Sequence, residues 1–162
     1  MISLNFESFL SLLTRSSKPS TNANRTLIEE NFSAVGVHYY ESNIQKLACQ
    51  NPDWKLSAAK IIESGKAEKK IFRYNYINKP VKLQPEPNNQ HDKNAVAVII
   101  AGELVGYISR EENVHVKTIL QRREVKSISG FIGGGEYKVI SKNKDVSKFD
   151  CSCTVNIRIK YI

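Results

Sequence analysis

The sequence lacks the features that mark exported and membrane-spanning proteins. Its three cysteines, Cys49, Cys151 and Cys153, are few and odd in number, which excludes a framework of paired disulfides. No stretch approaches the ~18 consecutive apolar residues of a membrane-spanning helix. The apolar N-terminal stretch, residues 1–13, has no basic region before it and is interrupted by polar residues, so we do not interpret it as a secretory signal. We therefore expect a cytoplasmic protein.

Motifs of catalysis and metal binding are also missing. The chain has no GxxxxGK(S/T) phosphate loop, no nucleophile elbow and no zinc-protease helix. Cys151 and Cys153 belong to an alternating apolar pattern over residues 149–161, which predicts one half-buried strand with both thiols on its apolar face. We therefore expect no enzymatic activity, no metal and no cofactor.

Positive charge is present in excess and is concentrated in two blocks. The formal net charge is +8. The segment from Trp54 to Lys82 contains eight Lys or Arg and two Glu. The segment from Asn113 to Lys148 contains eight Lys or Arg and three acidic residues. Basic blocks of this kind are typical of proteins that bind nucleic acid or another polyanion. A basic surface that serves only solubility remains an alternative.

The N-terminal residues have a different pattern from the rest of the chain. Apolar residues within 1–13 recur at the spacing of one face of a short amphipathic helix, and residues 15–25 are polar and without periodicity. We assign residues 1–31 to an N-terminal helix and linker, and residues 32–162 to a single domain with one core.

The domain is predicted to be mainly β with short helices. Strands are predicted at residues 32–40, 71–77, 81–84, 95–100, 104–108, 125–133 and 136–142, and from residue 149 onward. Helices are predicted to begin at Ser42, Asn51 and Ser109. Short strands joined by tight turns favour a small OB-like or SH3-like barrel of about six strands, with helices inserted between its first two strands and after the central hairpin.

Three details of this prediction concern turns and faces. The apolar run 95–100 is expected to be buried on both faces and to form the central hairpin with residues 104–108. Gly133 to Gly135 are interpreted as the turn of a second hairpin. Alternation in residues 71–77 places Phe72, Tyr74 and Tyr76 on one face, which we interpret as barrel core.

A polar run directly in front of the buried strand carries the most specific pattern in the chain. The run EPNNQHDKNAVAV occupies residues 86–98, and a Gly-Tyr-Ile sequence follows at 106–108. His91 and Asp92 are neighbours on an extended backbone and point in opposite directions, so they are not expected to act as a catalytic pair. A turn residue whose carboxylate accepts backbone N–H bonds is an alternative interpretation of Asp92.

These motifs, together with the VGVHYY sequence at 35–40, resemble the HIRAN domain, a module associated with DNA helicases, chromatin-remodelling ATPases and nucleases. The resemblance is to a stand-alone member of bacterial or phage type and covers residues 32–162. The matching signature positions are Glu86, Pro87, Asn89, Asp92, Asn94, Ala95, Val96, Val98, Gly106, Tyr107 and Ile108. The resemblance implies capture of single-stranded DNA at a free 3′-hydroxyl end.

The resemblance also implies roles for individual positions. Tyr39, with His38 and Tyr40 beside it, would stack on a base, and Asp92 would accept the hydrogen bond of the terminal hydroxyl. His91 stands where the family usually has a tyrosine, and Tyr107 would approach a phosphate. Tyr137 would match a later aromatic position. From their charge, we add as phosphate contacts Lys93, Lys117, Arg122, Arg123 and Lys138.

The sequence therefore favours a non-enzymatic module that recognises single-stranded DNA ends beside a helicase, remodeller or nuclease in DNA repair or replication. Two alternatives stay open. One is a protein-interaction adaptor that docks through residues 1–13 and does not bind DNA. The other is a metal-dependent phosphoesterase built on His91 and Asp92.

Overall fold

A computed structural model describes residues 26–76 and 79–162 of the chain. Of residues 1–31, which we assign to an N-terminal helix and linker, residues 1–25 lie outside the described residues, whereas residues 28–31 belong to the first strand of the domain. The described part consists of eleven strands with short helices between them. No helix in this part of the chain has the length and apolar character needed to cross a bilayer.

Six antiparallel strands form a nearly closed barrel. They are β5 (Val81–Pro85), β6 (Val96–Ile100), β7 (Glu103–Ile108), β1 (Ile28–Val35), β11 (Thr154–Tyr161) and β8 (Val125–Gly133), in that order across the sheet. The two outer strands approach each other where a Cβ on Gly130 of β8 would lie 2.9 Å from Cγ2 of Val81 on β5. A glycine at this point lets the sheet curl, and the predicted fold class is confirmed.

The barrel core is built largely from the central hairpin. Val96, Ala97, Val98 and Ile100 of its first strand are at most 2% exposed, and only Ile99 of this strand is partly exposed, so the predicted burial of both faces is confirmed. The turn residues Ala101 and Gly102 have φ angles of 48° and 89°, which suits the tight hairpin turn that matches strand twist. Helix α3 (Arg110–Arg122) packs on this core through Val116 and Ile119.

A long bent ribbon replaces the predicted second hairpin. β8 pairs with β11, whereas β9 (Tyr137–Ile140) pairs with β10 (Val146–Phe149). Between the two pairs, Gly135 and Cys151 exchange backbone hydrogen bonds of 2.8 and 3.3 Å, so the pairing continues. The prediction of a turn at Gly133 to Gly135 is therefore wrong, because the chain reverses at residues 141–145 instead.

The glycine run is the bend of this ribbon. Gly134 has φ of 96°, and a Cβ there would lie 2.3 Å from the carbonyl oxygen of Ser152, in the segment between β10 and β11. Only glycine accepts both this backbone conformation and this close approach. A turn and a bend both need glycine, which is why the sequence pattern did not distinguish them.

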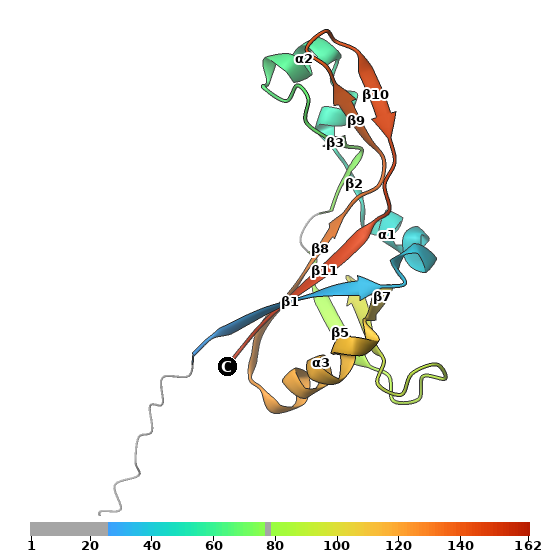
Figure 1. Cartoon of the computed structure of the whole chain (residues 1–162), viewed down its shortest axis with the longest axis vertical. Helices are drawn as coiled ribbons and strands as arrows, with labels where there is room; N and C mark the ends of the chain where they lie inside the picture. Colours follow the sequence, from blue (N-terminus) through green and yellow to red (C-terminus); the bar gives the residue numbers. More distant parts are fainter. Residues whose placement is uncertain (1–25, 77–78) are drawn as a thin grey trace, which may run out of the picture.

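The outer half of the ribbon belongs to a second, smaller unit, which we call the distal lobe (residues 52–73 and 136–149). Its three-stranded sheet has the order β10-β9-β3, where β3 is Ile71–Phe72. Helix α2 (Ala58–Glu63) packs on it through Ile61, which contacts Ile71 and Ile140. Figure 1 shows this lobe at the opposite end of the molecule from α3 and β5.

Several predicted elements are shorter or broken in the structure. The first strand ends at Val35, because Gly36 takes a left-handed conformation and starts a 3₁₀ helix, η3 (Val37–Tyr40). Helix α1 (Glu41–Leu47) follows it directly, and its N-cap position is occupied by Tyr40, whose side chain makes no capping hydrogen bond, rather than by the predicted Ser42. The helix predicted from Asn51 is divided into the 3₁₀ helix η4 (Pro52–Lys55) and α2, which Ser57 caps.

The strand predicted at 71–77 is also divided. β3 pairs with β9, whereas β4 (Tyr74–Asn75) pairs with β2 (Cys49–Gln50). Its aromatic residues consequently do not share one environment. Tyr76 packs against the barrel core, as predicted, but Phe72 contacts Tyr137 in the distal lobe.

The cysteines do not form the predicted strand face. Residues 150–153 lie outside any strand, at the level of the ribbon bend, so the alternating pattern is interrupted there. Cys151 is exposed, whereas Cys153 packs against the barrel core, and burial raises the pKa of the Cys153 thiol. Within the described residues, no group of three or more His, Cys, Asp or Glu side chains is placed to hold a metal ion.

Candidate nucleic-acid interface

The polar run between β5 and β6, residues 86–94, forms a loop that its own side chains hold in place; we call it the signature loop. The amide oxygen of Asn89 accepts hydrogen bonds from the backbone N–H groups of His91 (2.9 Å) and Asp92 (3.2 Å). The Asn89 amide nitrogen donates to the Glu86 carboxylate at 2.9 Å. The Ala95 N–H closes the loop on the carbonyl of Asp92. The loop conformation is thus fixed before any ligand binds.

Asp92 occupies the centre of this loop. Its Oδ1 accepts the Asn94 N–H at 2.8 Å, and its Oδ2 accepts the side-chain amide of Asn113 at 2.6 Å. The Arg110 Nε lies 4.0 Å from the same Oδ2, and the Asp92 side chain is 23% exposed. The turn role that we considered as an alternative is therefore present. A carboxylate can accept about four hydrogen bonds, so Asp92 keeps capacity for a ligand hydroxyl.

One face of helix α3 holds the loop from the other side. Arg110, Asn113 and Lys117 follow at the i, i+3, i+7 spacing that aligns side chains along a helix. Arg110 donates to the His91 carbonyl at 3.2 Å, and Lys117 donates to the Asn94 side chain at 3.0 Å. Residues 91–94 with Arg110, Asn113 and Val114 line a surface depression of about 420 Å³. The exposed Lys93 side chain also lines this depression.

A second group of aromatic side chains lies on η3, immediately after β1. Tyr39 is 77% exposed, and its ring centroid lies 3.8 Å from that of His38. The Tyr40 ring lies 6.2 Å from the ring of Tyr107 on β7. An exposed ring with a free face is what stacking on an unpaired base requires.

Tyr107 joins this aromatic group to the signature loop. Its hydroxyl donates to the Glu86 carboxylate at 3.3 Å, the same carboxylate oxygen that Asn89 contacts. Burial raises the pKa of Tyr107 to about 12, and the nearby Tyr40 and Glu86 side chains add to the shift. Tyr107 is therefore neutral at physiological pH, and its hydroxyl hydrogen is directed to Glu86; the phosphate contact predicted for it stays a prediction.

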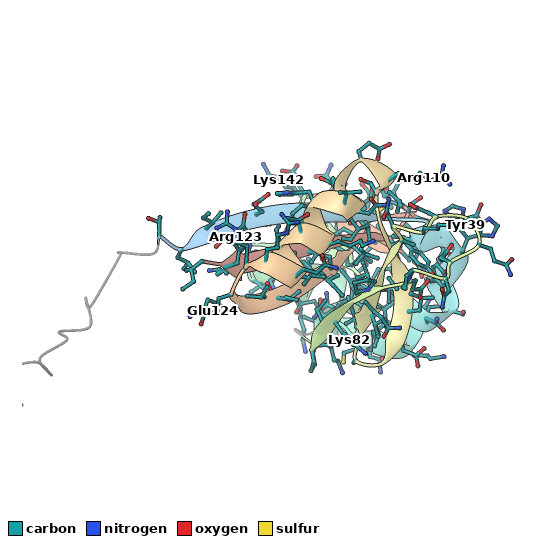
Figure 2. The ribbon with its side chains drawn as sticks, turned by 90° about the horizontal axis from the view of Figure 1, so that it is seen from below. Tyr39, Lys82, Arg110, Arg123, Glu124 and Lys142 are labelled. Carbon is teal, nitrogen blue, oxygen red and sulfur yellow. The ribbon has the colours of Figure 1, made fainter. Side chains whose placement is uncertain are left out.

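The structure brings together eight of the twelve residues that we predict for the site. They are His38, Tyr39, Tyr40, His91, Asp92, Lys93, Tyr107 and Lys117. Arg122 and Arg123 lie beyond them at the far end of α3, about 18 Å along the helix axis from Arg110 at 1.5 Å per residue. Figure 2 shows Arg110 and Tyr39 toward one end of the barrel and Arg123 toward the other.

Tyr137 and Lys138 also lie apart from the signature loop, in the distal lobe. Lys138 is only 7% exposed, and its ammonium donates to the carbonyls of Trp54 (2.8 Å) and Leu56 (3.3 Å). It lies on the side of β9 that α2 covers, because Ile140 two residues later belongs to the same small core. Its charge is therefore used within the protein.

Two residues of the interface were not predicted. Arg110 and Asn113 contact the loop backbone and the Asp92 carboxylate, and both come from α3. Asn113 is 2% exposed and precedes the buried Val116 by three residues, so it is a polar residue on the inner face of an amphipathic helix. That position was a detectable signal, since a buried amide needs a hydrogen-bonding partner.

Comparison with known proteins gives a family and two related structures. The HIRAN domain model matches residues 29–160. The crystal structure of the HIRAN domain of human HLTF shares 18% identity with a TM-score of 0.41, covering 82% of this chain and 74% of that one. A crystal structure of a Lactobacillus plantarum protein shares 17% identity with a TM-score of 0.39, covering 85% of this chain and 98% of that one. No curated protein matches the chain.

Proposed function

Because this chain belongs to the HIRAN domain family, we propose that it binds single-stranded DNA at a free 3′-hydroxyl end as an accessory to a DNA helicase, remodeller or nuclease in repair or replication. HIRAN domains are known as modules that bind DNA 3′ ends, and they are generally non-catalytic. The observation that carries the finer proposal is the Asp92 carboxylate, which lies in a depression among cationic side chains and is fixed by Asn94 and Asn113.

In this proposal, the aromatic group on η3 and the signature loop with α3 make different contributions to binding. The exposed Tyr39 ring stacks on a base, a contact worth about 1–3 kcal/mol that does not depend on base identity. Lys93, Arg110 and Lys117 attract the phosphates and make the affinity fall with salt. His91, which is exposed beside them, adds a smaller stacking surface.

Asp92 provides the selectivity for the strand end. A terminal hydroxyl donates a hydrogen bond to the carboxylate, whereas a terminal phosphate places like charges against each other. At 4 Å, two unit charges near a protein surface repel by about 4 kcal/mol, before the neighbouring cations reduce the effect. The depression therefore favours a hydroxyl end over a phosphate end.

The test is a fluorescence titration with three DNA ligands at two salt concentrations. We expect a single strand with a 3′ hydroxyl to bind about tenfold more tightly than the same strand with a 3′ phosphate, a difference of about 1.4 kcal/mol. Blunt duplex should bind more weakly than either. Equal affinity for all three ligands, or no binding at all, would falsify end recognition.

A pair of charge variants on α3 tests where the phosphates lie. Lys117→Gln removes a cation that contacts the signature loop, and we expect it to weaken binding and lower the salt slope by about 0.7, the value for one phosphate contact on a single strand. Arg122→Gln removes the same charge from the far end of the same helix and should leave the slope unchanged. Equal effects of the two variants would mean that only the net charge of the protein matters.

A further inference from the structure

Three aromatic rings form a row across the sheet of the distal lobe. Phe72 on β3 is the direct cross-strand partner of Tyr137 on β9, and Tyr137 is that of Phe149 on β10. Their ring centroids are 5.4 Å apart for Phe72 and Tyr137 and 5.3 Å apart for Tyr137 and Phe149, the latter pair nearly parallel at 23°. Directly paired residues lie on the same face of a sheet, so the three rings share one face.

The opposite face of this sheet is already covered. Lys138 and Ile140 alternate with Tyr137 along β9, and they contact Trp54 and Ile61 respectively. The aromatic row therefore lies on the face away from α2. Phe149 at its outer edge is 48% exposed, so the row is accessible to a partner.

The charge around the row fits a polyanion. The ammonium of Lys70 lies 4.7 Å from the centroid of the Tyr137 ring. The distal lobe contains ten Lys or Arg against five Asp or Glu. Within the described residues, Lys70 forms no ion pair, so its charge is available to a ligand. Aromatic rings with cations beside them are the usual means of binding single strands without base preference.

A groove lies beside the candidate interface, on the side of the barrel from which the chain leads to the row. It has a volume of about 450 Å³ and lies between residues 33–38 and residues 152–156. His38, next to Tyr39, is at one side of it. Ser152, on the other side, follows Phe149 by three residues. Because Ser152 is close to Phe149 in the chain, we take this groove as the path of a strand that leaves the candidate interface toward the row.

We propose that the row of Phe72, Tyr137 and Phe149 is a second contact surface for single-stranded DNA, which stacks on bases upstream of the bound 3′ end. This inference rests on the proposed function, since it takes the same strand as its ligand. Lys70 moves from the Tyr137 ring to a phosphate when a base stacks there. Short strands reach only the signature loop, whereas longer strands reach both surfaces.

The proposal predicts an effect that depends on strand length. OB-fold proteins cover roughly 4–16 nucleotides, so strands of four and twelve thymidines, each with a 3′ hydroxyl, serve as the two ligands. In Phe149→Leu and Lys70→Gln, we expect binding of the longer strand to weaken about five- to tenfold, at the low end of the stacking range, and binding of the shorter strand to stay unchanged. Lys60→Gln on α2 removes the same charge from the other side of the lobe and should change neither.

The outcomes separate this inference from a structural role and from end recognition. Unchanged binding of the longer strand in both variants overturns it, as does an equal loss for both strand lengths. Loss of self-association in the variants with DNA binding intact also overturns it and assigns the row to an interface between copies. If the variants lose binding of the longer strand only, and the unmodified protein shows no preference for a 3′ hydroxyl, the row is supported as a contact surface and end recognition is contradicted. Thermal melting confirms that each variant is folded.

Discussion

The Asp92→Asn variant is expected to lose its preference for a 3′-hydroxyl over a 3′-phosphate end while keeping most of its affinity for single strands. The substituted amide can still accept the Asn94 N–H, but it carries no charge to repel a terminal phosphate. The ratio of the two affinities should fall from about ten to about one, which corresponds to about 1.4 kcal/mol of selectivity. Competition binding with the two end-modified strands measures this ratio directly.

Asn113→Ala is the matched control, because it disturbs the same contact from the opposite side. It removes the amide that donates to Asp92 at 2.6 Å but keeps the carboxylate. We expect the free energy of unfolding to fall by about 1–3 kcal/mol, because a buried hydrogen bond is lost, while the hydroxyl preference remains. If Asn113→Ala loses the preference and Asp92→Asn keeps it, loop position rather than charge selects the strand end.

A larger effect on stability is expected at the bend of the ribbon. In Gly134→Ala, the new Cβ would lie 2.3 Å from the Ser152 carbonyl oxygen, and the residue would have to keep a φ of 96°. The backbone conformation alone costs about 1–2 kcal/mol, and the overlap adds about 1–3 kcal/mol more. Urea unfolding should therefore show a loss of about 2–5 kcal/mol.

Gly102→Ala separates the two causes. Gly102 has a similar φ of 89°, but nothing lies within 4 Å of a Cβ placed there. Only the conformational cost of about 1–2 kcal/mol should appear in this variant. Equal losses in the two proteins would show that the strands at Gly134 separate without cost, contrary to the pairing of Gly135 with Cys151.

The parts of the fold that were predicted correctly depend on local pattern. The run of apolar residues at 95–100 specified a strand with two buried faces, and Ala101-Gly102 specified the turn after it. The ribbon was not predicted, because β8 and β11 pair within the barrel over a long separation in sequence, and the glycine run was interpreted as the reversal that lies at residues 141–145. Gly133 to Gly135 carry the same local signal whether the chain turns or bends.

In the candidate site, too, the residues of a local motif were predicted, whereas those placed by tertiary packing were not. The signature loop was predicted from a contiguous motif, and the structure places Asp92 at its centre. Arg110 and Asn113 were missed because their contact with the loop depends on how α3 packs against the barrel. Lys138 was expected on a binding surface, but the side of β9 on which it lies is set by the packing of Ile140 against α2.

The unbroken pairing of the ribbon has a consequence for binding strength. Hydrogen-bonded strands, rather than a linker, connect the barrel to the distal lobe through the Gly135–Cys151 pair. The separation of the signature loop and the aromatic row is therefore set by the backbone. If both surfaces bind one DNA strand, as we propose, a strand bound at one is presented to the other at a high effective concentration. Two weak contacts would then combine as avidity, with little of the entropic cost that a flexible tether would add.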